Sequence, residues 1–292
     1  KGEMLIASER LQLLGGSRDM MRFLSKGLSA KEERIIYNYF QNRLSFKTED
    51  SKVYYESITD EFHFEKIGKV YAAFPNVITE ADINERHIIF QHTLDWLVTT
   101  IELFLKDASN TLIIRCHPAE ATMNKSKLSV EKEIYSLYPE VDSIANIHII
   151  KSSRKIDTYS VIKNQIDIGI IYEGVLGLEL ALLSTPVIIC GKGRLTDCSF
   201  GLEPKSRREY ESMLESPEII LKNWDIKFMM HRALEIGYWN FFDSAYYIPT
   251  IADYYEIGTP FYKAVKYRKL RMEHLDTRLN EDLKRTIEKL LS

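Results

Sequence analysis

The stretch DIGIIYEGVLGLELALLSTPVIIC, residues 167–190, decides the fold of this chain. It holds two short apolar runs, DIGII at 167–171 and PVIIC at 186–190, and between them a glycine-containing turn that leads into a helix from about Leu176. Strands that are apolar throughout are typical of a parallel sheet with both faces covered. The stretch therefore predicts a strand, a helix and a second strand parallel to the first.

The same alternation extends toward the N-terminus as far as residue 69. Further strands are expected at 69–74 (KVYAAF), 111–115 (TLIIR) and 146–150 (NIHII), with helical segments at 86–106, 127–138 and 158–163. Five short apolar strands connected by helices are typical of a doubly wound sheet. The sequence thus predicts the α/β class, with a Rossmann-like doubly wound parallel sheet and helical N- and C-terminal flanks.

Helical patterns dominate the two flanks. A capping box, Ser29-x-x-Glu32, begins an apolar helical pattern over 29–44. Further helices are expected at 206–214, 225–242 and 275–291. The chain is therefore divided into a helical N-terminal region (1–68), a Rossmann-like domain (69–224) and C-terminal helices that pack on it (225–292).

The composition excludes some classes of function. The 292 residues carry 39 Lys and Arg against 42 Asp and Glu, a formal net charge of −3, which removes the electrostatic reason to expect broad binding of DNA or RNA. The longest run without a charged residue, 180–191, is shorter than the roughly 18 residues of a membrane span. Three cysteines in no metal-binding spacing predict reduced cytosolic thiols and no structural metal.

Ligands of doubly wound sheets bind beyond the carboxyl ends of the strands, and the turn after the strand at 167–171 is the first candidate. Gly174 and Gly177 lie where this strand becomes a helix, so that backbone N–H groups can approach a phosphate. Glu179 falls in the first helical turn, where its carboxylate could accept hydrogen bonds from ribose hydroxyls. The alternative, which two glycines in this spacing favour, is a tight turn in which Gly177 only lets helix and sheet pack closely.

Imidazole and basic groups follow two other strands. His117 comes directly after the strand at 111–115 and is held near its end by Pro118, so it could donate to a phosphate or assist a leaving group. A histidine that is hydrogen-bonded within its own loop is an equally good interpretation. Lys192 and Arg194 lie in a glycine-flanked loop and suit a diphosphate or a sugar acid, although solvated side chains explain them nearly as well.

Carboxylates in the same loops are candidates for a general base. Sugar transfer with inversion needs a carboxylate that deprotonates the acceptor hydroxyl. Glu80 and Asp82 follow the first strand, and Glu173 follows the strand at 167–171. Most carboxylates in loops are simply solvated, and that interpretation applies to each of the three taken alone.

Several strings taken together resemble a known family. IIRCHPAE (113–120), YEGVLGLELALLSTPVIICGKG (172–193) and FGLEPKSRREYESML (200–214) resemble the donor-binding half of bacterial capsule-polysaccharide and lipopolysaccharide glycosyltransferases of the GT-B fold, in the branch of capsule-type Kdo transferases. In that family the His-Pro pair and the Gly-x-Glu start of a helix are associated with the nucleotide of the sugar donor. The resemblance implies this role for His117, Gly177 and Glu179.

The function implied is that of a glycosyltransferase, or of its donor-binding domain, that moves a sugar from a CMP- or UDP-type donor to a bacterial surface polysaccharide. Neither a cofactor nor a metal ion is expected. The candidate catalytic residues are His117, Asp82 and Glu80. The candidate donor-binding residues are Arg115, His117, Tyr172, Glu173, Gly174, Gly177, Glu179, Lys192 and Arg194.

The expected partners are the nucleotide-sugar donor and a glycan or glycolipid acceptor, without nucleic acid. A cytoplasmic location is expected, with peripheral contact to the inner membrane or to other polysaccharide-assembly enzymes left open. A complete GT-B enzyme has two Rossmann-like domains, so either the chain is the C-terminal part of a larger enzyme or residues 1–68 are a reduced helical substitute for an acceptor domain. Two alternatives stay open: a nucleotide-sugar 2-epimerase-like enzyme and a non-catalytic nucleotide-binding or assembly module.

Overall fold

A five-stranded parallel sheet forms the centre of the protein. The computed structural model describes residues 4–5, 18–48, 58–78, 89–123, 129–193, 195–243, 245–246, 252–256 and 263–267. The strands of the sheet are β2 (Val70–Phe74), β3 (Thr111–Arg115), β4 (Ile147–Ile150), β5 (Ile168–Ile171) and β6 (Val187–Ile189). Each lies within one residue of its predicted ends, and the predicted Rossmann-like sheet is confirmed.

The order of the strands places a switch point at the middle of the sheet. The order is β4-β3-β2-β5-β6, and every neighbouring pair is parallel. From β2 the chain moves outward through β3 to β4, and from β5 it moves in the opposite direction to β6. The connections therefore diverge between β2 and β5, which is the place where doubly wound sheets bind ligands.

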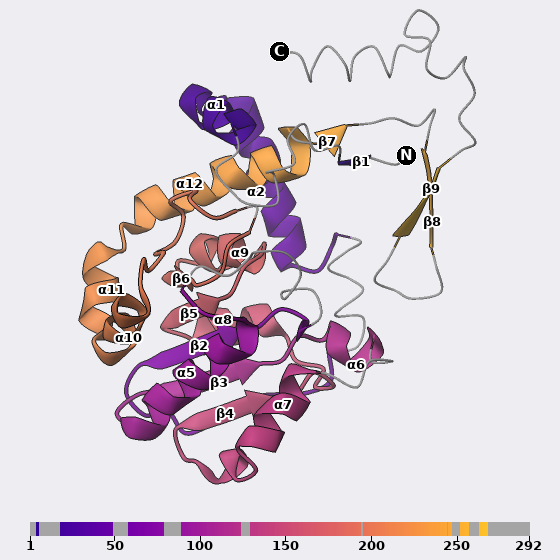
Figure 1. The fold of residues 1–292 in the computed structure, drawn as a ribbon. Coiled ribbons are helices and arrows are strands. Elements are labelled where there is room, and N and C mark those ends of the chain that lie inside the picture. The colour runs from indigo at the N-terminus through magenta and orange to yellow at the C-terminus, as the bar shows by residue number, and fades with distance from the viewer. Residues whose placement is uncertain are drawn as a thin grey trace, which may run out of the picture.

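One face of the sheet is covered by the helices that follow β2, β3 and β6 (Figure 1). They are α5 (Thr93–Lys106), α7 (Val130–Leu137), α10 (Arg207–Glu215) and α11 (Pro217–Asn223). Trp96, Leu97 and Ile101 of α5 are completely buried against the apolar strands. This burial of large side chains fixes α5 along the sheet.

The opposite face carries two layers of helices (Figure 1). The inner helices are α8 (Thr158–Gln165) and α9 (Leu176–Leu182), and the outer ones are α1 (Arg18–Lys26), α2 (Ala30–Leu44) and α12 (Ile226–Tyr238). α12 packs on both α9 and α2. The predicted capping box is confirmed, since the Ser29 hydroxyl and the Glu32 carboxylate each accept from the other residue's backbone N–H. The N-terminal flank is thus docked on the same core as the sheet.

Shorter elements complete the described chain. They are α6 (Ala119–Met123), a 3-10 turn (Val141–Ser143), a π-helical turn (Trp239–Asp243), and the strands β1 (Met4–Leu5), β7 (Ala245–Tyr246), β8 (Ala252–Glu256) and β9 (Lys263–Tyr267). β1 pairs with β7 and β8 with β9, both antiparallel. The helix predicted at 275–291 lies outside the described residues. None of the helices in the described part of the chain is long and apolar enough to cross a membrane.

The structure corrects the bounds of two predicted helices. The helix expected at 86–106 begins only at Thr93, because the Nδ1 atom of His92 accepts from the backbone N–H of Asp95 and caps it. The helix expected at 225–242 is α12 followed by the π-helical turn. The helix α11 escaped prediction, although Pro217 stands at its first turn, a common position for proline.

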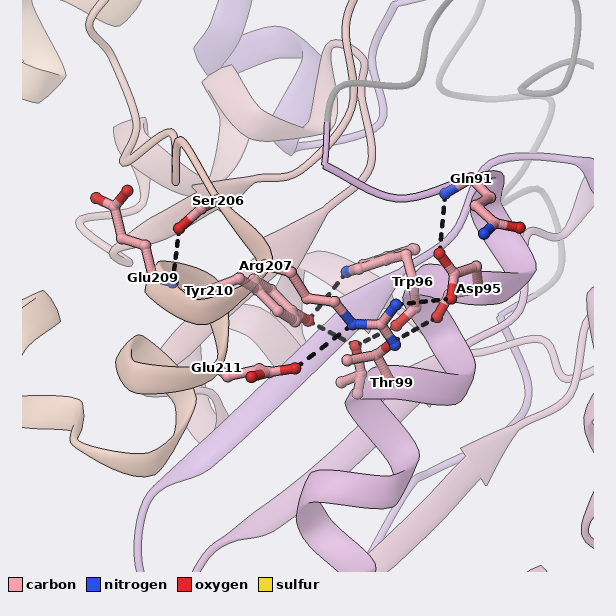
Figure 2. Close-up of polar contacts among 10 residues, drawn as sticks. Gln91, Asp95, Trp96, Thr99, Ser206, Arg207, Glu209, Tyr210 and Glu211 are labelled. Carbon is pink, nitrogen blue, oxygen red and sulfur yellow. Dashed lines mark hydrogen bonds and ion pairs between the residues drawn. The ribbon is translucent and has the colours of Figure 1, made fainter.

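Polar contacts between α5 and α10 hold the first face together at one end (Figure 2). The indole N–H of Trp96 donates to the Tyr210 hydroxyl over 3.0 Å, and that hydroxyl lies 2.5 Å from the Thr100 hydroxyl. Above them Arg207 forms an ion pair with Asp95, 3.2 Å between Nη1 and Oδ1. Residues more than a hundred positions apart are joined by this set of contacts, which we call the α5–α10 joint.

Candidate functional site

A pocket of about 230 Å³ opens at the switch point of the sheet, beyond the carboxyl ends of β2, β3 and β5. Three turns that follow these strands supply Asn76, His117, Glu173 and Gly174 to its wall. Arg115 comes from the end of β3, and the helices of the opposite face supply Arg43 of α2, Thr158 and Tyr159 of α8, and Glu179 of α9. Its location agrees with the general rule for ligands of doubly wound sheets.

His117 stands at the end of β3 as a neutral imidazole. Its Nδ1 atom accepts a hydrogen bond from the backbone N–H of Ala119 over 3.2 Å, so the ring hydrogen is on Nε2. Burial and the neighbouring Arg115 lower the pKa of His117 to about 4. At neutral pH the ring can therefore donate a hydrogen bond from Nε2, but it brings no positive charge into the pocket.

Arg115 anchors one wall of the pocket. Its guanidinium donates from Nη1 to the carbonyl of Lys151 over 2.7 Å and from Nη2 to the carbonyl of Arg154 over 3.2 Å. These bonds tie the end of β3 to the loop after β4. The side chain is only 5% exposed, so its positive charge acts on the pocket through the field it creates more than through an exposed surface.

The turn after β5 lies close to the turn after β2. Gly174 has a φ of +115°, a conformation that side chains other than glycine rarely adopt, and a Cβ built on it would lie 3.8 Å from Nδ2 of Asn76. The buried Oδ1 atom of Asn76 has no hydrogen-bond partner among the described residues. A buried acceptor in this state calls for a donor, which a ligand hydroxyl would supply.

Arg43 reaches the pocket from the last turn of α2. Its Nε donates to a carboxylate oxygen of Glu179 in the first turn of α9, and the two side chains are 16% and 3% exposed. Burial by itself would lower the pKa of Arg43, but the Glu179 carboxylate, together with Tyr159 and Tyr39, more than offsets burial and holds that pKa above its usual value. The two residues form a buried ion pair between helices 136 positions apart in sequence.

Glu120 links two loops beside the pocket. Its Oε1 accepts from the backbone N–H of Ile78, after β2, over 3.3 Å and from that of Val130, at the start of α7, over 3.1 Å. The side chain is buried, and this burial raises its pKa. Ile78 is the last described residue before the segment that carries Glu80 and Asp82. Glu120 therefore holds the backbone in place directly before that segment.

The described residues offer no place for a metal ion. Nowhere among them do three or more His, Cys, Asp or Glu side chains gather closely enough to hold one. Cys116, Cys190 and Cys198 are buried free thiols, and burial raises the pKa of Cys116 and of Cys190. High pKa values make these thiols poor nucleophiles at neutral pH.

No family model matches the chain, and no curated protein matches its sequence. Solved structures do resemble it. They include the UDP-GlcNAc 2-epimerase of Neisseria meningitidis bound to UDP-GlcNAc, with 16% identity and a TM-score of 0.38 over 58% of this chain and 43% of that one. KpsC of Thermosulfurimonas dismutans, a beta Kdo 2,7 transferase, gives 11% identity and a TM-score of 0.40 over 67% of this chain and 57% of that one.

The wall teichoic acid polymerase TagF is a third similar structure, with 9% identity and a TM-score of 0.38 over 68% of this chain and 45% of that one. This chain therefore spans between 43% and 57% of the length of the three structures. The neighbours include a Kdo transferase, the class that the sequence motifs resemble.

The structure brings together five of the candidate donor-binding residues. Arg115, His117, Glu173, Gly174 and Glu179 all line the pocket. Their convergence results from the parallel sheet, which places the ends of β3 and β5 on the same edge.

Three other candidates lie elsewhere. The Tyr172 ring is completely buried, with its centroid 5.5 Å from that of Trp96, and belongs to the core. At Gly177 a Cβ would lie 2.6 Å from Cδ1 of Ile171, so this glycine serves the packing of α9 on the sheet. Lys192 is not among the residues that line the pocket. Glu80, Asp82 and Arg194 lie outside the described residues, and their roles stay predictions.

Three residues of the pocket lining could not be recognised from the sequence, namely Arg43, Thr158 and Tyr159. Thr158 and Tyr159 follow β4, whose loop carries no glycine or histidine that would mark it. Arg43 was hidden because it belongs to a flanking helix, and its place depends on how α2 packs on α12, which in turn packs on α9. Its only sequence signal is a basic residue in the last turn of an amphipathic helix, which normally interacts with the helix dipole.

Proposed function

We propose that this chain binds the donor of a nucleotide-sugar-dependent glycosyltransferase in the pocket at the switch point, and that the sugar passes from there to a glycan or glycolipid of the bacterial surface. The observation that carries the proposal is the combination of location and lining. A pocket at the place where doubly wound sheets take nucleotides offers an Nε2–H donor on His117, two carboxylates, and an acceptor on Asn76 to which none of the described residues donates. The motifs that resemble the donor-binding half of GT-B enzymes support the same function.

The proposed reaction is a direct displacement at the anomeric carbon of the donor. The acceptor hydroxyl oxygen forms a bond to that carbon while the bond from the carbon to the donor phosphate oxygen breaks. The hydroxyl proton passes to a carboxylate, for which Glu80 and Asp82 are the candidates, and the nucleotide leaves with the electron pair and one more negative charge. We propose a donor of the CMP or UDP type and a reaction without cofactor or metal.

His117 is proposed to stabilise the charge that develops on the departing phosphate. A neutral imidazole that is already oriented by the Ala119 N–H needs no reorganisation to donate from Nε2. Loss of one such donor typically costs about 10²- to 10³-fold in kcat. His117→Ala should therefore reduce transfer by about that factor, if transfer is measured with this protein together with any further domain the enzyme requires.

Nucleotide binding is the direct test of the proposal. Calorimetric titration of the purified protein with CMP, UDP and GDP should detect binding of CMP or UDP, and His117→Ala should weaken it by about tenfold, the value of one hydrogen bond. His63→Ala is a matched control, because that imidazole is 81% exposed and lies outside this pocket. Absence of binding for all three nucleotides would contradict the proposal.

Incubation with nucleotide sugar then separates transfer from the two alternatives. Release of nucleotide that requires an acceptor supports the transferase. Free sugar or an epimer formed from the donor alone would replace it with the epimerase-like enzyme. Nucleotide binding without turnover, in a protein supplied with its complete natural sequence, would identify a binding or assembly module.

A further inference from the structure

The N-terminal flank takes part in the pocket. α2 is the helix that carries Arg43 into the pocket lining, and Arg43 contacts Glu179 across the packed interface of α2, α9 and α12. The guanidinium also lies beside the Phe241 ring, whose centroid is 5.9 Å from Cζ, and its charge interacts with the Tyr39 side chain. An arginine fixed on several sides holds its partner carboxylate in one orientation.

The charges of the lining indicate which part of a ligand Glu179 can contact. Two arginines, Arg43 and Arg115, and two carboxylates, Glu173 and Glu179, face the same pocket. A carboxylate repels a phosphate but accepts hydrogen bonds from hydroxyl groups, and its two oxygens suit the two hydroxyls of a vicinal diol. In a nucleotide the ribose carries such a diol.

Glu179 depends on Arg43 to stay in the orientation in which it accepts hydrogen bonds from the ribose hydroxyls. At 3% exposure its carboxylate has little contact with water, and without its partner it would be driven to turn toward solvent. A displaced carboxylate no longer faces the hydroxyl groups of the ligand. Arg43 thus acts on the ligand through Glu179.

We infer that Arg43 is a positioning residue, supplied by the N-terminal flank, that gives the pocket its selectivity for a ligand with an intact ribose diol. The inference rests on the proposed function, because it assigns one part of the nucleotide to one part of the same pocket. It also gives the flank a role in ligand binding in addition to its place in the core.

The test compares ribonucleotides with their 2′-deoxy forms. For the unaltered protein, replacing CMP or UDP by dCMP or dUDP should weaken binding by about 10- to 100-fold, since a hydrogen bond to a charged group is lost. In Arg43→Gln this discrimination should fall below about threefold, while Arg43→Lys, which keeps the charge, should retain part of it. Glu179→Gln should lose the discrimination as well, and the double variant Arg43→Gln/Glu179→Gln should lose no more than either single one.

Arg34→Gln is the matched control, an exposed arginine on the same helix that should bind as the unaltered protein does. Circular dichroism confirms that each variant is folded, and Arg43→Lys keeps the test decisive if Arg43→Gln unfolds. Full discrimination in a folded Arg43 variant would overturn this inference and leave the proposed function intact. Failure of the unaltered protein to bind any of the nucleotides would overturn both.

Discussion

Two arginines join distant helices on opposite faces of the sheet, and their surroundings differ. Arg43 links α2 to α9 through Glu179, and both side chains are largely buried beside the pocket. Arg207 links α10 to α5 through Asp95, but it is 46% exposed and lies at the surface of the α5–α10 joint (Figure 2). An ion pair between an arginine and a carboxylate thus joins two helices once in a buried site and once at the solvent-exposed surface.

The difference shows which contact each region depends on. In the α5–α10 joint the buried hydrogen bonds of Tyr210 with Trp96 and Thr100 lie beneath the exposed ion pair, so the pair adds little to what they already secure. At the pocket the ion pair itself is buried, and neither charge can be removed without leaving the other in a poor environment. We therefore expect the pocket region to respond to single substitutions much more strongly.

The strongest test of this contrast is Arg43→Ala. Removing one partner of a buried ion pair typically costs about 3–5 kcal/mol, because the remaining charge is left without compensation. Urea unfolding at pH 7 should show a loss in this range, and Arg34→Ala on the exposed side of α2 should show almost none. Adding Glu179→Gln to Arg43→Ala should restore part of the stability. A loss below about 1 kcal/mol would mean that the pair is solvated and the contrast false.

A second test uses the pH dependence of stability at His117. The pKa of this imidazole is lowered to about 4, below its ordinary value of 6.5, mainly by burial. Between these pH values the unfolded chain binds a proton at this residue and the native state does not. The contribution of the neutral imidazole to the free energy of unfolding is therefore complete above pH 6.5 and is lost as the pH falls toward 4. We expect the native state to lose roughly 2–3 kcal/mol over this range.

Urea unfolding between pH 4.5 and 7.5 measures this loss as the difference between the unaltered protein and His117→Gln, which removes the titrating group. Arg207→Gln should keep the pH slope of the unaltered protein, because the α5–α10 joint is distinct from the pocket. Parallel curves for the unaltered protein and His117→Gln would show that the imidazole is not held in its neutral form.

The sheet could be predicted from the sequence because its signal is local. Each strand is a short run such as TLIIR whose members are all apolar, and burial on both faces leaves no other place for such a run. The Ser29 capping box was equally local, since its two partners are three residues apart. The turns after the strands then located the pocket, because parallel strands end at one edge.

The chemistry of the site was less accessible from sequence because it depends on contacts between remote segments. His117 could be placed at the end of a strand, but whether it is charged follows from its burial beside Arg115. Tyr172 follows β5 as predicted, yet its ring belongs to the core, since the chain turns there toward Trp96. Arg43 contacts Glu179 because α2 packs on α12 on the opposite face of the sheet. A local sequence pattern cannot predict such a contact.

The third test concerns the buried part of the α5–α10 joint. Tyr210→Phe removes the hydroxyl that accepts from the Trp96 indole N–H and leaves that buried donor without its partner. An unsatisfied buried donor costs about 1–3 kcal/mol, so the variant should unfold at a correspondingly lower urea concentration. Nucleotide binding should be unchanged, because Tyr210 does not line the pocket. Weaker nucleotide binding in a fully folded variant would show that the two regions are coupled.

The smallest effect is expected from Arg207→Gln, the direct counterpart of the substitution at Arg43. The substitution removes the ion pairs of Arg207 with Asp95 and with Glu211, which lies 3.4 Å from its Nε, and the hydrogen bond from Nη2 to the Thr99 hydroxyl. Water reaches the three charged side chains and replaces much of what the ion pairs contributed, and the Thr99 hydroxyl keeps its bond to the carbonyl of Asp95. Exposed pairs are worth about 0–1 kcal/mol, and glutamine keeps part of the packing over the Phe90 ring. The urea midpoint should therefore move less than it does for Tyr210→Phe, and it should move less still in 1 M salt, where the exposed pair of the unaltered protein is already screened. A shift as large as that of Arg43→Ala would mean that the exposed arginine stabilises the native state as much as the buried one does. Burial would then no longer explain the difference between the two regions.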